Sequence, residues 1–83
     1  MELIKIIDLL KSLNDKSREL CIEFADIKKD CDLYRFVGSI DKAIDFTLKN
    51  NLENFKVHEY FSINNMTIIM CDNRWIKKED FKK

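Results

Sequence analysis

The first third of the chain repeats an apolar residue at alternating steps of three and four positions. The pattern holds over about four heptads, with Ser17 as its weak member. This spacing is typical of the a and d positions of a helix that packs along its length against another helix. It predicts a long N-terminal helix over residues 2–31. The seam residues are Leu3, Ile6, Leu10, Leu13, Ser17, Leu20, Phe24, Ile27 and Cys31.

The segment Asn14-Asp15-Lys16-Ser17 is the weak point of this helix, because Asn, Asp and Ser favour caps and turns. Asp15 could cap a second helix and convert the segment into a helical hairpin. One helix is favoured, because a turn usually resets the heptad phase and the phase continues here. A helix of about 30 residues is about 45 Å long, which exceeds the width of a domain of this size.

A helix of this length predicts pairing with a second chain, and an intramolecular hairpin is the alternative. We predict a homodimer in which Glu23 and Lys28, at g and e positions, pair between the two chains. Ile4, Ile7 and Leu9 make the first turns apolar on several sides, so this half is expected to anchor the core. The predicted interaction seam comprises Leu10, Leu13, Leu20, Glu23, Phe24, Ile27 and Lys28.

A second helix is predicted over residues 39–51. Ser39 is a good N-cap, Asp41 lies near the positive helix end, and Asn50-Asn51 suits a C-cap. Between the two predicted helices, the apolar residues of 33–37 suit a short strand or an extended link.

The rest of the chain predicts an antiparallel β-meander over residues 55–77. The strand-like segments 55–63 and 66–71 are joined by Asn64-Asn65, which suits a type I′ turn. Asp72-Asn73 suits another tight turn before a short strand at 74–76. The predicted fold is therefore α+β in one domain, 1–83, with a sheet of three strands, or four if 33–37 joins it.

Alternation along these strands predicts which side chains share a face. The first face is expected to be the core face and carries Phe55, Val57, Phe61, Ile63, Met66, Ile68, Met70 and Trp75. The second face is mixed in polarity and carries Lys56, His58, Tyr60, Ser62, Thr67, Ile69, Cys71, Arg74 and Ile76.

Composition fits a folded chain of 83 residues, with 46% hydrophobic and 36% charged residues and no net charge. The zero net charge removes the simplest argument for a nucleic-acid binder. The start of the chain does not resemble a signal peptide, and no stretch approaches 18 uncharged apolar residues, so no membrane span is expected. We therefore expect a cytoplasmic protein with no membrane association, whose three cysteines are reduced thiols.

One constellation suggests catalysis, because the predicted register places His58 opposite Cys71 with Arg74 in the same row. Such neighbours can activate a thiol. A partly buried cysteine beside a surface histidine is the preferred interpretation, since every loop is short. One histidine, no Cys-x-x-Cys pair and a single glycine give no metal site and no phosphate loop. We predict no enzyme activity, no catalytic residues and no cofactor.

The sequence therefore favours a small regulatory protein that binds other proteins and self-associates through its N-terminal helix. Abundant Lys, Ile and Asn indicate an AT-rich genome, which suits an inhibitor from a phage or mobile element. The alternative is a nucleic-acid-binding regulator that uses the mixed face and the C-terminal lysines. The candidate partner surface for that alternative is Lys56, His58, Tyr60 and Arg74.

Overall fold

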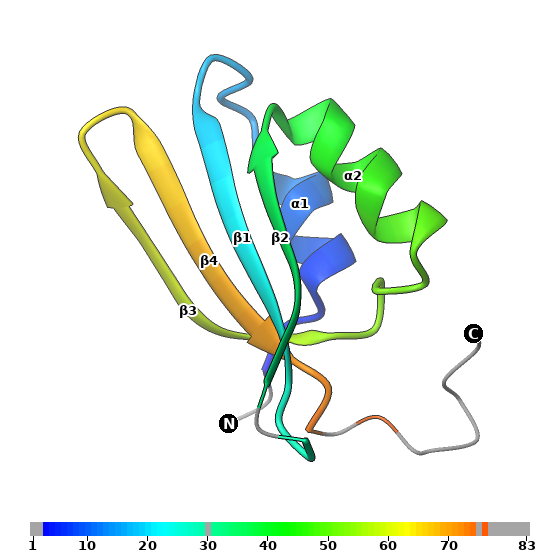
Figure 1. The fold of residues 1–83 in the computed structure, drawn as a ribbon. Coiled ribbons are helices and arrows are strands. Elements are labelled where there is room, and N and C mark those ends of the chain that lie inside the picture. Colours follow the sequence, from blue (N-terminus) through cyan, green and yellow to red (C-terminus); the bar gives the residue numbers. More distant parts are fainter. Residues whose placement is uncertain (1–2, 30, 75, 77–83) are drawn as a thin grey trace.

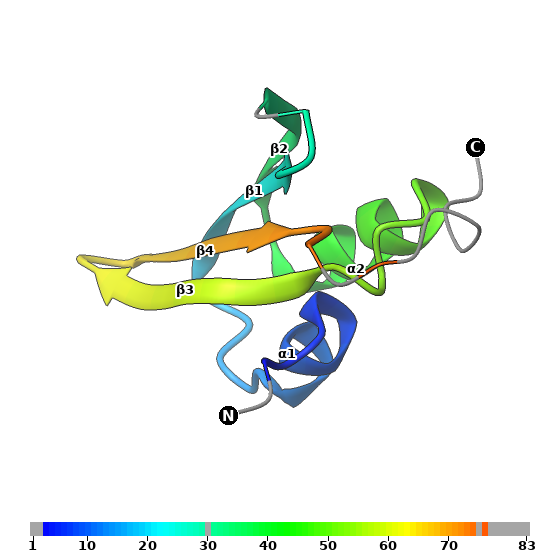
Figure 2. The same ribbon diagram turned by 90° about the horizontal axis from the view of Figure 1, so that it is seen from below.

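The computed structural model describes residues 3–29, 31–74 and 76. Two helices lie on one side of a four-stranded sheet (Figures 1 and 2). The helices are α1 (Ile6–Ser12) and α2 (Ile40–Lys49). The strands are β1 (Glu19–Asp26), β2 (Cys31–Gly38), β3 (Lys56–Ile63) and β4 (Met66–Asp72).

The sheet consists of two hairpins joined through their central strands. Its order is β2-β1-β4-β3, with β1–β2 and β3–β4 antiparallel and β1–β4 parallel. The parallel pairing requires a crossover from one hairpin to the other, and α2 supplies it. The sheet is therefore mixed, and the predicted purely antiparallel meander is wrong.

The predicted long N-terminal helix is also wrong. Helix α1 ends at Ser12, and residues 19–26 form a central strand. In that strand Leu20, Ile22 and Phe24 are buried, which is the two-residue period of a strand. The step from Leu20 to Phe24 fits both patterns, because four residues are two strand periods and about one helical turn. The heptad pattern is therefore a coincidence over this stretch.

The chain leaves the helix near the weak point seen in the sequence. Leu13 is already extended, and the Asp15 carboxylate accepts hydrogen bonds from Ser17 N at 3.1 Å and from Ser17 Oγ. These bonds hold the pKa of Asp15 below its ordinary value. Arg18 then donates hydrogen bonds to Thr67 Oγ1 at 2.9 Å and to Met66 O at 3.2 Å. The turn thus directs β1 alongside β4.

The second helix is confirmed. Ser39 is its N-cap and accepts a hydrogen bond from Lys42 N at 3.4 Å. At the other end, Asn50 is the C-cap and Asn51 has a φ of 58°, a left-handed conformation that Asn tolerates better than most residues. The segment predicted as a short strand at 33–37 lies within β2.

The hairpin around Asn64-Asn65 is confirmed, because Ile63 pairs with Met66 and leaves a two-residue turn. Only Asn64 of the two has a positive φ, at 55°, whereas the predicted type I′ turn needs both. The predicted third strand at 74–76 is wrong, because Arg74 lies in a turn. Trp75 and residues 77–83 lie outside the described residues.

The core lies between the helices and one face of the sheet. Phe24 is at its centre, with ring centroids 5.7 Å from Phe55 and 6.0 Å from Phe46. Ile6 and Leu10 of α1 are completely buried against it. Burial of such side chains, each contributing about 1.5–3 kcal/mol, stabilises the packing of both helices against this face. The opposite face receives no helix among the described residues.

Candidate functional site

The uncovered face of the sheet carries a continuous row of apolar side chains, one from each strand. Val37 pairs with Cys21, Cys21 with Ile68, and Ile68 with Phe61. Paired residues point to the same side of a sheet. Val37 is 53% exposed and Phe61 is 46% exposed. We call Val37, Cys21, Ile68 and Phe61 the apolar row.

Two flanking rows extend this surface along the strands. On one side Met66 pairs with both Glu19 and Ile63, and Ile63 is among the most exposed apolar residues, at 56%. On the other side Met70 pairs with Glu23 and Glu59. We call the apolar row and these two flanking rows the open face. It has an apolar centre with carboxylates on both sides.

Three basic side chains near the open face contact other groups of the described chain. Arg35 donates a hydrogen bond to Glu23, and Arg74 Nη2 lies 3.5 Å from Asp72 Oδ2. Lys56 Nζ donates a hydrogen bond to Leu3 O at 3.5 Å. In contrast, Glu19 and Glu59 are exposed, and their carboxylates have no partner among the described residues. Glu19 and Glu59 are therefore the carboxylates of the open face that remain available to a partner.

The prediction of which face forms the core is wrong for most of the β3–β4 hairpin. Thr67, Ile69 and Cys71 are buried under the helices, although they belong to the predicted mixed face. The predicted core residues Phe61, Ile63, Met66, Ile68 and Met70 lie on the open face.

A β-bulge between Val57 and Glu59 explains part of this inversion. The bulge inserts an extra residue and shifts the alternation, so that Phe55 and Val57 are buried as predicted while Phe61 is not. In β4 both sets of alternating residues are largely apolar, with Thr67 the polar member of one set, so alternation alone could not identify the buried face.

The structure disperses the predicted interaction seam. Leu10, Leu20 and Phe24 are buried core residues, and Leu13 packs against the same core. Glu23 lies on the open face, while Ile27 and Lys28 follow β1 in the turn toward β2. No helix among the described residues joins the members of this seam.

The predicted partner surface is divided as well. His58 Nε2 lies 2.9 Å from Asp72 Oδ2, an ion-pair distance, although this nitrogen makes no regular hydrogen bond in the described structure. Arg74 contacts the same carboxylate. Tyr60 instead lines a cleft of about 270 Å³ with Ser12 and Ile40, on the helix side. Tyr60 therefore faces the helices, whereas His58 and Arg74 meet at the Asp72 carboxylate.

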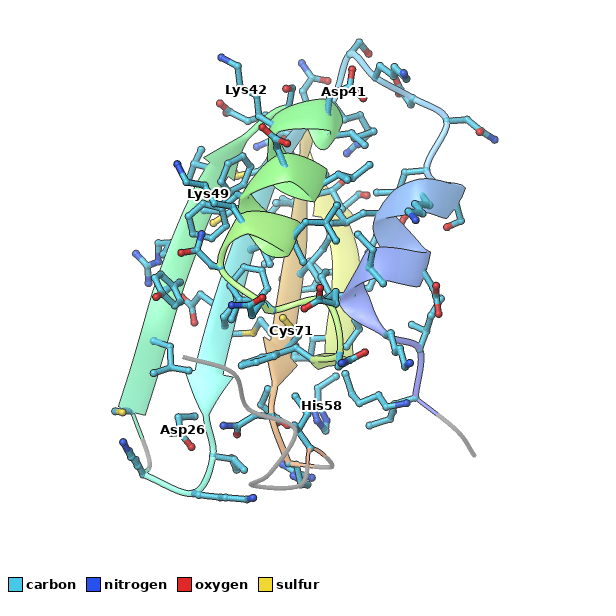
Figure 3. The ribbon with its side chains drawn as sticks, turned by 90° about the vertical axis from the view of Figure 1, so that its right-hand side faces the viewer. Asp26, Asp41, Lys42, Lys49, His58 and Cys71 are labelled. Atoms are coloured by element: carbon cyan, nitrogen blue, oxygen red, sulfur yellow. The ribbon has the colours of Figure 1, made fainter. Side chains whose placement is uncertain are left out.

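The thiols differ in environment. Cys71 pairs with Val57 and not with His58, and its Sγ donates a hydrogen bond to Glu23 O at 3.3 Å. Burial, aided by the nearby Asp72 charge, raises the pKa of Cys71 far above its ordinary value, which suppresses the nucleophilic thiolate. In Figure 3 Cys71 lies inside the fold, apart from His58. Cys21 is half-buried in the apolar row, and Cys31 is exposed.

Asp26 connects the end of β1 to the segment after β4. A hydrogen bond from Asn73, followed by backbone bonds from Lys28 and Lys29, holds the pKa of Asp26 below its ordinary value. Asn73 Oδ1 also accepts a hydrogen bond from Ile27 N at 3.0 Å. Asp26 and Asn73 are both buried. This arrangement is structural, since these polar groups satisfy one another.

The residues of the open face that sequence reasoning missed as a site are Val37, Cys21, Ile68, Phe61, Glu19 and Glu59. The available signal was the segment 66–71, in which both alternating sets are largely apolar. A strand that is apolar on both faces has two faces to bury, and the two helices of the described residues lie on only one of them.

Comparison of the chain with known protein families, with curated proteins and with solved structures finds no match. Among the described residues, no helix is long and apolar enough to cross a membrane. The same part of the chain contains no group of three or more His, Cys, Asp or Glu side chains that could hold a metal ion.

Proposed function

We propose that this chain is a non-enzymatic binding module that docks another protein on the open face of its sheet. The observation that carries the proposal is the apolar row, which crosses all four strands without a covering element among the described residues. Four strands about 4.8 Å apart are separated by three spacings, so the row extends over about 14 Å. Contiguous apolar surface of this kind marks interaction sites in proteins that are otherwise well packed.

The charges of the open face favour a protein over other partners. The unpaired groups are the carboxylates of Glu19 and Glu59, which repel the phosphates of nucleic acids. A second copy of the same face would bring like charges together, which costs affinity. A different protein with an apolar patch and nearby cations avoids both costs.

The thiol chemistry supports the non-enzymatic part of the proposal. Cys71 and His58 do not form a pair, and burial raises the pKa of Cys71. The alternative of a nucleic-acid-binding regulator stays a prediction, as does the origin in a phage or mobile element. The structure adds no observation in favour of either.

Site-specific photocrosslinking in cells that carry the gene tests the proposal. A benzophenone amino acid replaces Phe61 on the open face or, as the control, Leu48 on α2, because the two side chains are 46% and 45% exposed. We expect a discrete protein adduct from position 61 and not from position 48. Adducts of equal yield from both positions, or an adduct with nucleic acid, would overturn the proposal.

A further inference from the structure

The two unpaired carboxylates lie at opposite corners of the apolar surface. Glu19 is on β1 beside Met66, and Glu59 is on β3 beside Met70. Met70 also pairs with Glu23, so Glu59, Met70 and Glu23 share one row across the sheet. Glu23 is four residues beyond Glu19 along β1. The two carboxylates are therefore separated by two strands sideways and by four residues along the sheet.

Standard strand dimensions convert this offset into a distance. Two strand spacings are about 10 Å and four residues are about 13 Å, so the diagonal is about 16 Å. Ile68 on β4 lies at its midpoint, with Phe61 and Cys21 on either side in the apolar row. The diagonal thus joins two negative charges through an apolar centre.

An α-helix matches this diagonal. At 1.5 Å per residue, about 16 Å corresponds to about 11 residues, or three turns, so cations at the two ends of three turns reach both carboxylates. Apolar side chains on the same helix face then lie over Ile68. We propose that the partner docks through an amphipathic helix with Lys or Arg about eleven residues apart. This inference rests on the proposed function.

The surface around Glu19 offers room for such a cation. Glu19 lines a groove of about 390 Å³ together with Ile63, Met66 and the Asn64-Asn65 turn. A lysine or arginine can lay its apolar stem along Ile63 and Met66 while its charged end meets Glu19. At the other end of the diagonal, Glu59 is exposed beside Met70, which is 36% exposed.

The test measures binding of two synthetic helical peptides to the full chain by fluorescence anisotropy. Both are 18 residues long with leucines along one face, and they carry either two lysines or two glutamates eleven residues apart. We expect the lysine peptide to bind at least about tenfold more tightly, because each glutamate faces Glu19 or Glu59 in repulsion. Added salt should reduce this difference, since the charges are exposed.

Substitutions in the chain distinguish the contribution of charge to peptide affinity from the contribution of apolar contact. Glu19→Gln with Glu59→Gln is expected to weaken binding of the lysine peptide by about five- to tenfold, as loss of two exposed ion pairs implies. Asp8→Asn with Asp45→Asn is the control, because it changes net charge equally on exposed helix residues, and it should leave the affinity within about twofold. Phe61→Asp should abolish binding of both peptides.

In the peptide experiments, the inference would be overturned by equal affinity for the two peptides or by an unchanged affinity after both glutamates are replaced. In either case photocrosslinking from position 61 still reports whether the face binds a protein, so the two proposals fail separately. A dimer in sedimentation that Phe61→Asp dissociates would identify a second copy as the occupant and would also overturn the inference.

Discussion

The two faces of the sheet are made of similar residues and differ in what covers them. The helix side carries Leu20, Ile22 and Ile69, all at most 1% exposed, while the open face carries Val37 and Phe61 at about half exposure. Apolar side chains on the first face stabilise the fold. Similar side chains on the second face contribute less to stability, which leaves them available for binding. Paired substitutions can test this comparison directly.

The largest difference is expected between two phenylalanines. Phe24→Ala removes a completely buried ring that contacts Phe46 and Phe55, so it should lower the free energy of unfolding by about 3–5 kcal/mol. Phe61→Ala on the open face should lower it by about 1 kcal/mol or less. Urea denaturation followed by circular dichroism measures both. Equal losses would show that the open face is packed.

Two adjacent isoleucines on opposite faces of β4 compare the two faces more closely than the two phenylalanines do. Ile69 is fully buried and Ile68 is partly exposed. Ile69→Ala should cost about 3 kcal/mol, and Ile68→Ala about 1 kcal/mol. Because residue type, strand and substitution are identical, a difference near zero would mean that the assignment of the two faces is wrong.

The cysteines extend the comparison to chemistry. Cys71 faces the helices, where burial raises its pKa, whereas Cys21 lies in the apolar row and Cys31 is exposed. With a thiol probe at neutral pH, native Cys71 should react about 100-fold more slowly than Cys31, and Cys21 should be intermediate. Mass spectrometry of a time course identifies each site. Rapid labelling of Cys71 in the folded protein would contradict its burial.

The smallest expected effect concerns acid stability. The pKa of Asp26 is lowered in the folded state, so the carboxylate stabilises the fold above its unfolded pKa of about 3.8. That contribution is lost as the pH falls through the folded pKa. Asp26→Asn should therefore lower stability at pH 7 and flatten its decline below pH of about 4. Thermal unfolding of both proteins from pH 2 to 7 measures the pH dependence of stability. An identical pH profile in the variant would show that the Asp26 carboxylate does not stabilise the fold.

Local signals in the sequence predicted local structure correctly. Ser39 and Asn50-Asn51 bounded the second helix, and Asn64-Asn65 marked the turn of a hairpin, because caps and turns depend on neighbouring residues. The expectation of a break near Asp15 was the better guide to the N-terminal third. The heptad phase continues through this segment only because the buried positions of β1 coincide with it.

The parts that failed depend on contacts between distant residues. The parallel pairing of β1 with β4 places Leu20 opposite Thr67. No local sequence pattern predicts this pairing, because the two residues are far apart in the chain. The bulge after Val57 changed the faces of β3, and β4 was apolar on both sides. The open face was therefore not predictable as a site, because it results from which face the two helices cover.

The most direct test of the open face is hydroxyl-radical footprinting of the isolated chain, in which oxidation of Phe61 is compared with oxidation of Phe24. The account predicts rapid modification of Phe61, which is 46% exposed, and strong protection of Phe24, which is fully buried. If Phe61 were protected as strongly as Phe24, the face would already be covered in the free protein. That result would contradict its role as a docking surface.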